Sequence, residues 1–104
     1  DMLLEALVAC AGVTLKAVAT AISVPIRQGK IRAEGDLDFR GTLGVVKEAP
    51  VGFSDIRLIF DLDADATPDQ IETLIKLTKR YCVIYQTLQQ SPALDLAIQT
   101  TEPA

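Results

Sequence analysis

The sequence contains no histidine and no tryptophan, and only two of its 104 residues are cysteines, Cys10 and Cys82. Without histidine the chain cannot form a Ser–His or Cys–His dyad and has no imidazole for general acid–base catalysis. Two isolated cysteines do not make a zinc site, which needs more ligands at short paired spacings. Gly41 and Gly44 lack the Lys-Ser/Thr ending of a phosphate-binding loop. We therefore expect no bound metal and no cofactor.

Basic charge is also scarce, with 10 Lys and Arg against 14 Asp and Glu, a net charge of −4. A nucleic-acid surface is normally basic, so we expect no nucleic-acid partner. No basic segment precedes the first apolar run, so we predict no secretory signal. Two cysteines without a signal indicate the reducing cytoplasm, where a disulfide is transient or catalytic. Hydrophobic residues make up 49%, enough for a core, and we expect one domain over residues 1–104.

The longest apolar stretch covers residues 1–22, which contain strong helix formers and no proline. The expected inward face has three-or-four spacing and comprises Leu3, Leu7, Cys10, Thr14, Val18 and Ala21. A helix apolar on nearly every side is either buried in a protein or spans a membrane. Glu5 and Lys16 interrupt the run, and the amphipathic segments downstream need a core. We favour the buried helix and expect no membrane partner.

Residues 30–40 and 53–64 alternate between apolar and charged side chains, which predicts two half-buried antiparallel strands. Residues 41–52 contain several Gly and Pro residues and read as a hairpin connection. Asp61, Asp63 and Asp65 could suggest a cation site, but the glycine and terminal glutamate of an EF-hand are missing. The solvated face of a strand is the simpler interpretation of these carboxylates.

A second helix begins at Thr67-Pro68-Asp69-Gln70, where Thr67 and Gln70 form a capping box. We expect this helix, straight or bent, to continue to about Gln90 before Ser91-Pro92. Its expected inward stripe comprises Ile71, Leu74, Ile75, Thr78 and Cys82. The cluster of Lys76, Lys79 and Arg80 faces either water near a helix end or a partner, and the solvated face is the simpler interpretation.

The alternation of Leu94, Leu96 and Ile98 with more polar residues predicts a last strand. The element order is then helix, strand, strand, helix, strand. This order predicts an α+β fold in which a small, mostly antiparallel sheet packs on two long helices. One sheet cannot cover the first helix on all its apolar sides, so we expect a homodimer.

Both cysteines lie on expected inward stripes, and the residues alone leave two alternatives open. Free cysteine often packs as a small buried hydrophobe, which predicts two inert thiols. Chemistry would require a thiolate, and Cys10 in the middle of a helix would need a nearby cation. Arg27, Arg32 and Arg40 are the candidates for that cation within the chain.

The segments LLEALVACAGVTL around Cys10 and RYCVIYQTL around Cys82 resemble the two cysteine segments of OsmC/Ohr proteins, the osmotically inducible and organic hydroperoxide resistance family. The resemblance covers essentially the whole chain and implies an OsmC-like fold. Family members have an N-terminal β segment that supplies an arginine to the first cysteine. The chain lacks it and starts at Asp1, close to the family's carboxylate position, so we expect that the sequence is a fragment. Val83 stands where the family commonly has a proline.

The resemblance implies a thiol-dependent peroxidase that reduces alkyl or fatty-acid hydroperoxides. Cys10 would form a sulfenic acid, Cys82 would resolve it as a disulfide, and an external dithiol, such as a lipoylated protein, would reduce the pair. It also implies a homodimer with active sites at the interface. A non-catalytic OsmC-like dimer that binds an apolar ligand at its interface is the alternative. A structural fragment with two buried, inert thiols is the third.

Overall fold

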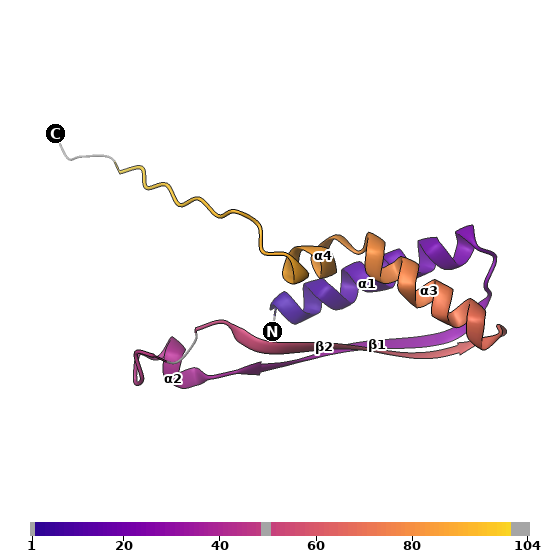
Figure 1. Ribbon diagram of the computed structural model, residues 1–104, viewed down its shortest axis with the longest axis horizontal. Helices are drawn as coiled ribbons and strands as arrows, with labels where there is room; N and C mark the ends of the chain where they lie inside the picture. The colour runs from indigo at the N-terminus through magenta and orange to yellow at the C-terminus, as the bar shows by residue number, and fades with distance from the viewer. Residues whose placement is uncertain (1, 49–50, 101–104) are drawn as a thin grey trace.

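The computed structural model describes residues 2–48 and 51–100. The elements in chain order are α1 (Met2–Ala21), β1 (Ile26–Leu37), α2 (Phe39–Thr42), β2 (Phe53–Ala64), α3 (Pro68–Tyr81) and α4 (Val83–Gln89). Strands β1 and β2 form a two-stranded sheet, and α1, α3 and α4 lie on one side of it (Figure 1). The predicted α+β class, with both long helices on one face of an antiparallel sheet, is confirmed.

The sheet has the alternation that the sequence predicts. Strands β1 and β2 pair antiparallel, with Ile31 opposite Phe60 and Ala33 opposite Leu58. These side chains are partly buried on the face that carries the helices, whereas the charged residues between them are exposed. Side chains of a strand point alternately to its two faces, so one face is wet and the other packs.

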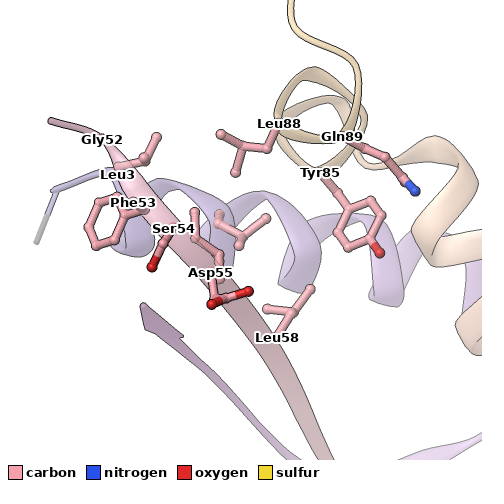
Figure 2. A pocket seen from close by; sticks show the side chains of 11 residues that line it. Leu3, Gly52, Phe53, Ser54, Asp55, Leu58, Tyr85, Leu88 and Gln89 are labelled. Carbon is pink, nitrogen blue, oxygen red and sulfur yellow. The ribbon is translucent and has the colours of Figure 1, made fainter. Parts of the chain in front are cut away.

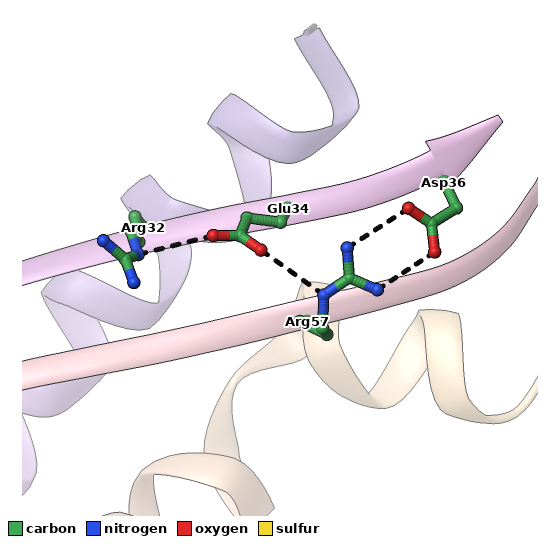
Figure 3. Close-up of polar contacts among 4 residues, drawn as sticks. All are labelled: Arg32, Glu34, Asp36 and Arg57. Atoms are coloured by element: carbon green, nitrogen blue, oxygen red, sulfur yellow. Dashed lines mark hydrogen bonds and ion pairs between the residues drawn. The ribbon is translucent and has the colours of Figure 1, made fainter.

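Ion pairs join the two strands on the exposed face (Figure 3). Arg57 contacts both carboxylate oxygens of Asp36, at 3.1 and 3.2 Å, and its Nε lies 3.4 Å from Glu34. Arg32 Nε lies 3.6 Å from Glu34 and extends the chain of charges. Solvent screens exposed pairs, but these cross-strand contacts favour the observed register.

The residues of α1 that are buried are Leu7, Ala11, Leu15 and Ala19. This stripe is rotated from the expected one: Cys10, Thr14 and Val18 are only partly buried, and Ala21 is exposed. Because α1 is apolar on nearly every side, its own sequence does not define the packed face, and contact with the sheet and α3 selects it. Leu15 and Ala19 form one core cluster with Val24 and Leu74.

The end of α1 and the start of α3 are each fixed by local hydrogen bonds. Helix α1 ends with Ser23 at a positive φ of 58°. The Val24 N–H returns to the Ala19 carbonyl at 2.9 Å, the hydrogen bond of a Schellman motif. Helix α3 begins with the predicted capping box, in which Thr67 and Gln70 each accept a hydrogen bond from the other's backbone N–H.

Two strand predictions are corrected. Strand β1 begins at Ile26, before the predicted start at Lys30, because Ile26 and Gln28 already pair with Ala64 and Asp63 of β2. It ends at Leu37, short of Arg40, because the Asp38 carboxylate accepts a hydrogen bond from the Arg40 N–H and caps the short helix α2. Residues 91–100 form no strand within the described chain. Leu94 is 88% exposed and Ile98 is 81% exposed. Alternation alone does not make a strand, since its backbone groups need a neighbouring edge to pair with.

By length and composition, one helix in the described residues, α1, could cross a membrane. Core helices of water-soluble proteins pass the same test. In this structure one stripe of α1 packs on the sheet, α3 and α4, and much of its remaining surface is uncovered.

Candidate functional site

A break between α3 and α4 positions Cys82. Helix α3 ends at Tyr81, and Cys82 adopts an extended conformation with φ −75° and ψ 112°. Its N–H donates to the Thr78 carbonyl at 3.0 Å, and its carbonyl accepts from the Gln86 N–H at 3.0 Å. Cys82 therefore closes one helix and opens the next. The expected helix through Gln90 is interrupted here although Val83 is not a proline.

The break directs the Cys82 side chain into the core, where it is only 1% exposed. Cys82, Leu7 and Ala11 form a second buried cluster, against which Cys10 packs. The Cys82 thiol donates to the Cys10 sulfur across an Sγ–Sγ distance of 3.2 Å. Both cysteines are free thiols. The structure thus brings together the two sulfurs that the sequence singled out, although 72 positions separate them.

Main-chain donors lower the pKa of the Cys10 thiol. The hydrogen bond from the Ile84 N–H has the largest effect, and burial opposes it by raising the pKa. The Cys82 thiol, the Val83 N–H and the Thr14 hydroxyl each lower the pKa further. The first N–H groups of a helix have no partner within the helix, so those of α4 are free to donate to a thiolate.

The pKa of the Cys82 thiol is shifted in the opposite direction, upward. Burial is the main cause that raises its pKa, and the adjacent Cys10 sulfur adds to the increase. Hydrogen bonds from the Tyr85 and Ile84 N–H groups only partly offset it. The pair is therefore asymmetric, with Cys10 the better thiolate and Cys82 the protonated donor beside it.

None of the three candidate arginines stands beside Cys10 in the described part of the chain. Arg27 pairs with Asp63, Arg32 with Glu34 and Arg40 with Asp38, all at exposed positions. The groups that shift the pKa of Cys10 include no cation. Sequence reasoning missed the donors of α4 because they are backbone groups, and no side-chain pattern marks them. Only the break at Cys82 would have revealed them.

The thiol asymmetry predicts different alkylation rates. In the Cys82→Ala variant, Cys10 should react with iodoacetamide at a lower pH than an ordinary thiol, because its thiolate forms at lower pH. In Cys10→Ala, Cys82 should require a higher pH than an ordinary thiol. Rates measured from pH 6 to about 10, with glutathione as the reference thiol, give both midpoints. Equal midpoints for the two variants would contradict the asymmetry.

A pocket of about 480 Å³ adjoins the cysteine cluster. Figure 2 shows around it Leu3 near the start of α1, residues 52–55 and Leu58 of β2 and its approach, and Tyr85, Leu88 and Gln89 of α4. Leu7, Leu58 and Tyr85 belong both to its wall and to the cluster that holds the two sulfurs. Most of the wall is apolar, which suits an alkyl or aryl group.

The described residues contain no group of three or more His, Cys, Asp or Glu side chains that could hold a metal ion. Asp61 and Asp63 are exposed residues of β2, and Asp63 is engaged by Arg27 at 2.8 Å. These carboxylates thus lie at exposed positions, as the simpler interpretation predicted.

Comparison with known proteins gives two matches. The family model described as OsmC-like protein matches residues 1–97. The crystal structure of an OsmC-like protein from Mycoplasma pneumoniae superposes with a TM-score of 0.75 at 23% sequence identity. The match covers 86% of this chain and 60% of the M. pneumoniae chain, so this chain spans less than two thirds of that protein. No curated protein matches the sequence.

Proposed function

Because the chain belongs to the OsmC-like protein family, we propose that it is a thiol-dependent peroxidase that reduces organic hydroperoxides. Membership of this family by itself suggests a peroxiredoxin-like or stress-related function. The observation that carries the finer proposal is the asymmetric sulfur pair, with Cys82 Sγ 3.2 Å from Cys10 Sγ. Inert packed cysteines would not need thiolate-stabilising donors around one member of the pair.

The proposed reaction has two steps. The Cys10 thiolate attacks the terminal oxygen of the hydroperoxide, the O–O bond breaks, and the alkoxide takes a proton and leaves as an alcohol. Cys10 is then a sulfenic acid. The Cys82 sulfur attacks it, an S–S bond forms, and hydroxide leaves with the Cys82 proton as water. The short sulfur separation supports the second step, since little movement is needed to form the bond.

The pocket beside the cysteine cluster supports the proposed substrate class. The pocket next to the cluster is mostly apolar, and its volume of about 480 Å³ fits an alkyl or aryl group. Such a pocket favours a fatty or alkyl hydroperoxide over hydrogen peroxide, because burial of the chain adds binding free energy.

The proposal includes a homodimer and an external dithiol reductant in a reducing cytoplasm. The uncovered side of α1 supports the homodimer, because Val13 is 72% exposed on a largely apolar helix. The disulfide must be reduced for a second turnover, and a lipoylated protein supplies a suitable dithiol.

The thiol count after one oxidation tests this proposal. Reduced protein receives one equivalent of cumene hydroperoxide, and free thiols and remaining peroxide are followed together. We expect rapid loss of both thiols, with one peroxide consumed per disulfide. The Cys10→Ser/Cys82→Ser double variant is the blank and should consume none. Thiols that survive while peroxide persists would refute the peroxidase.

A second function is favoured by the same pocket. An OsmC-like dimer without catalytic activity could hold an apolar ligand against Leu3, Leu7 and Leu88. This alternative predicts that the thiols resist hydroperoxide, whereas an alkyl probe still binds. The thiol count therefore separates the two functions.

A further inference from the structure

Three cations gather at the C-terminal end of α3, immediately before Cys82. Lys76, Lys79 and Arg80 are exposed and line a surface hollow of about 540 Å³. Among the described residues, none of the three forms an ion pair with a carboxylate. This uncompensated basic cluster stands out on a chain whose net charge is −4.

Aromatic rings orient two of these cations without neutralising them. Lys79 Nζ lies 5.7 Å from the centroid of the Tyr85 ring, and Arg80 Cζ lies 5.7 Å from that of Tyr81. The face of a ring attracts a cation through its quadrupole but carries no net charge. The positive charge therefore remains available to an anionic partner, at defined positions.

Lys79 and Arg80 each border a hollow that has Cys82 in its wall. A pocket of about 150 Å³ has Lys79, Tyr85 and Cys82 in its wall. A wider hollow of about 440 Å³ has Arg80, Tyr81 and Cys82 in its wall. The Cys82 side chain is only 1% exposed in this structure, so a molecule that enters either hollow meets one of these cations before it reaches the sulfur.

The chemistry of reduction favours attack at Cys82. In thiol–disulfide exchange the sulfur with the lower pKa leaves more readily. The N–H groups at the start of α4 stabilise Cys10 as a thiolate, so Cys10 is the better leaving group of a Cys10–Cys82 disulfide. The incoming thiolate is then expected to bond to the Cys82 sulfur, the one beside the basic cluster.

Building on the proposed function, we propose that Lys76, Lys79 and Arg80 form the docking surface for an acidic protein that carries a dithiol and reduces the Cys10–Cys82 disulfide. Its first thiolate bonds to Cys82 Sγ, the S–S bond breaks, and the electron pair leaves with Cys10 as a thiolate. The partner's second thiolate then attacks the partner sulfur that is bonded to Cys82. This attack releases the Cys82 thiolate, which takes a proton from water. The partner ends as a disulfide, and this protein ends with a Cys10 thiolate and a Cys82 thiol.

The test separates docking from chemistry by presenting the same dithiol with and without an acidic carrier. The full chain is first oxidised with one equivalent of cumene hydroperoxide, and disulfide formation is checked, which tests the proposed function on its own. If no disulfide forms, diamide supplies it and the docking test proceeds. Reduction is then timed with a reduced lipoyl domain of net negative charge and with free dihydrolipoamide.

The test variant carries Lys76→Gln, Lys79→Gln and Arg80→Gln. A matched control removes three exposed cations elsewhere, as Lys16→Gln, Lys30→Gln and Lys47→Gln. For the test variant we expect kcat/KM with the lipoyl domain to fall at least about tenfold, with no change for free dihydrolipoamide. The control should lose much less. An equal loss in both variants, no loss, or an equal loss with free dihydrolipoamide would overturn the proposal.

Two measurements on the unaltered chain complete the test. The rate with the lipoyl domain should fall as salt rises, while that with dihydrolipoamide stays constant, because salt screens exposed charges. Independence from salt would overturn the docking surface even if the variant misfolded. Glutathione added to the disulfide and quenched with N-ethylmaleimide should be found on Cys82. A glutathione adduct on Cys10 instead would overturn the site of attack.

Discussion

In the Cys10→Ser variant the rate of hydroperoxide consumption is expected to fall at least about a thousandfold, because the variant lacks the thiolate that attacks the O–O bond. Cys82→Ser should behave differently. Its Cys10 keeps the main-chain donors of Val83 and Ile84, so it should consume about one equivalent of peroxide and then stop in the absence of a reductant. Peroxide assays and dimedone labelling of the sulfenic acid measure the two outcomes.

The two serine variants control each other, since each removes one sulfur of the same 3.2 Å pair. Dimedone should label Cys10 in Cys82→Ser and nothing in Cys10→Ser. If instead Cys10→Ser consumed peroxide and became labelled at Cys82, the roles of the two cysteines would be reversed. Such a result would contradict the asymmetry, in which burial disfavours the Cys82 thiolate.

Leu74→Ala is expected to lower the free energy of unfolding by about 2–5 kcal/mol, the range for buried Leu-to-Ala substitutions. Leu74 is 0% exposed and joins α3 to Leu15 and Ala19 of α1. Loss of its side chain leaves a cavity between α1, which carries Cys10, and α3, which ends just before Cys82. Single domains are stable by only about 5–15 kcal/mol, so this one change should shift the urea midpoint strongly.

A Leu-to-Ala change at an exposed site is the matched control. Leu43 follows α2 at the tip of the hairpin and is 73% exposed. Leu43→Ala should change the free energy of unfolding by no more than about 0.5 kcal/mol. Urea unfolding followed by circular dichroism measures both variants. Similar losses for the two would contradict the place of Leu74 in the core.

Local patterns predicted most elements of the fold. The alternation over residues 53–64 gave the bounds of β2, and the capping box of Thr67 and Gln70 located the start of α3. Each signal depends on neighbours within a few positions, so the sequence holds all of it. The end of β1 was missed by a few residues because Asp38 could serve equally as a strand residue or as a cap.

The candidate cysteines could also be found from the sequence, because the segments around Cys10 and Cys82 resemble the two cysteine segments of OsmC/Ohr proteins. The groups that surround the two sulfurs could not be predicted from the sequence. From the sequence, thiolate chemistry at Cys10 would need a nearby cation, whereas the described structure places backbone N–H groups of Val83 and Ile84 there. Each non-proline residue has the same N–H, so only the break in the chain at Cys82 makes these two available.

The sequence by itself determined the α+β class, the two paired strands, the starts of α1 and α3 and the two sulfurs worth attention, because periodicity and capping act over short distances. The tertiary structure alone decided which side of α1 is buried, where α3 breaks, and that residues 91–100 stay unpaired within the described chain. Each of these depends on a neighbour from a distant part of the chain: an apolar helix needs a surface to select its face, and a strand needs an edge.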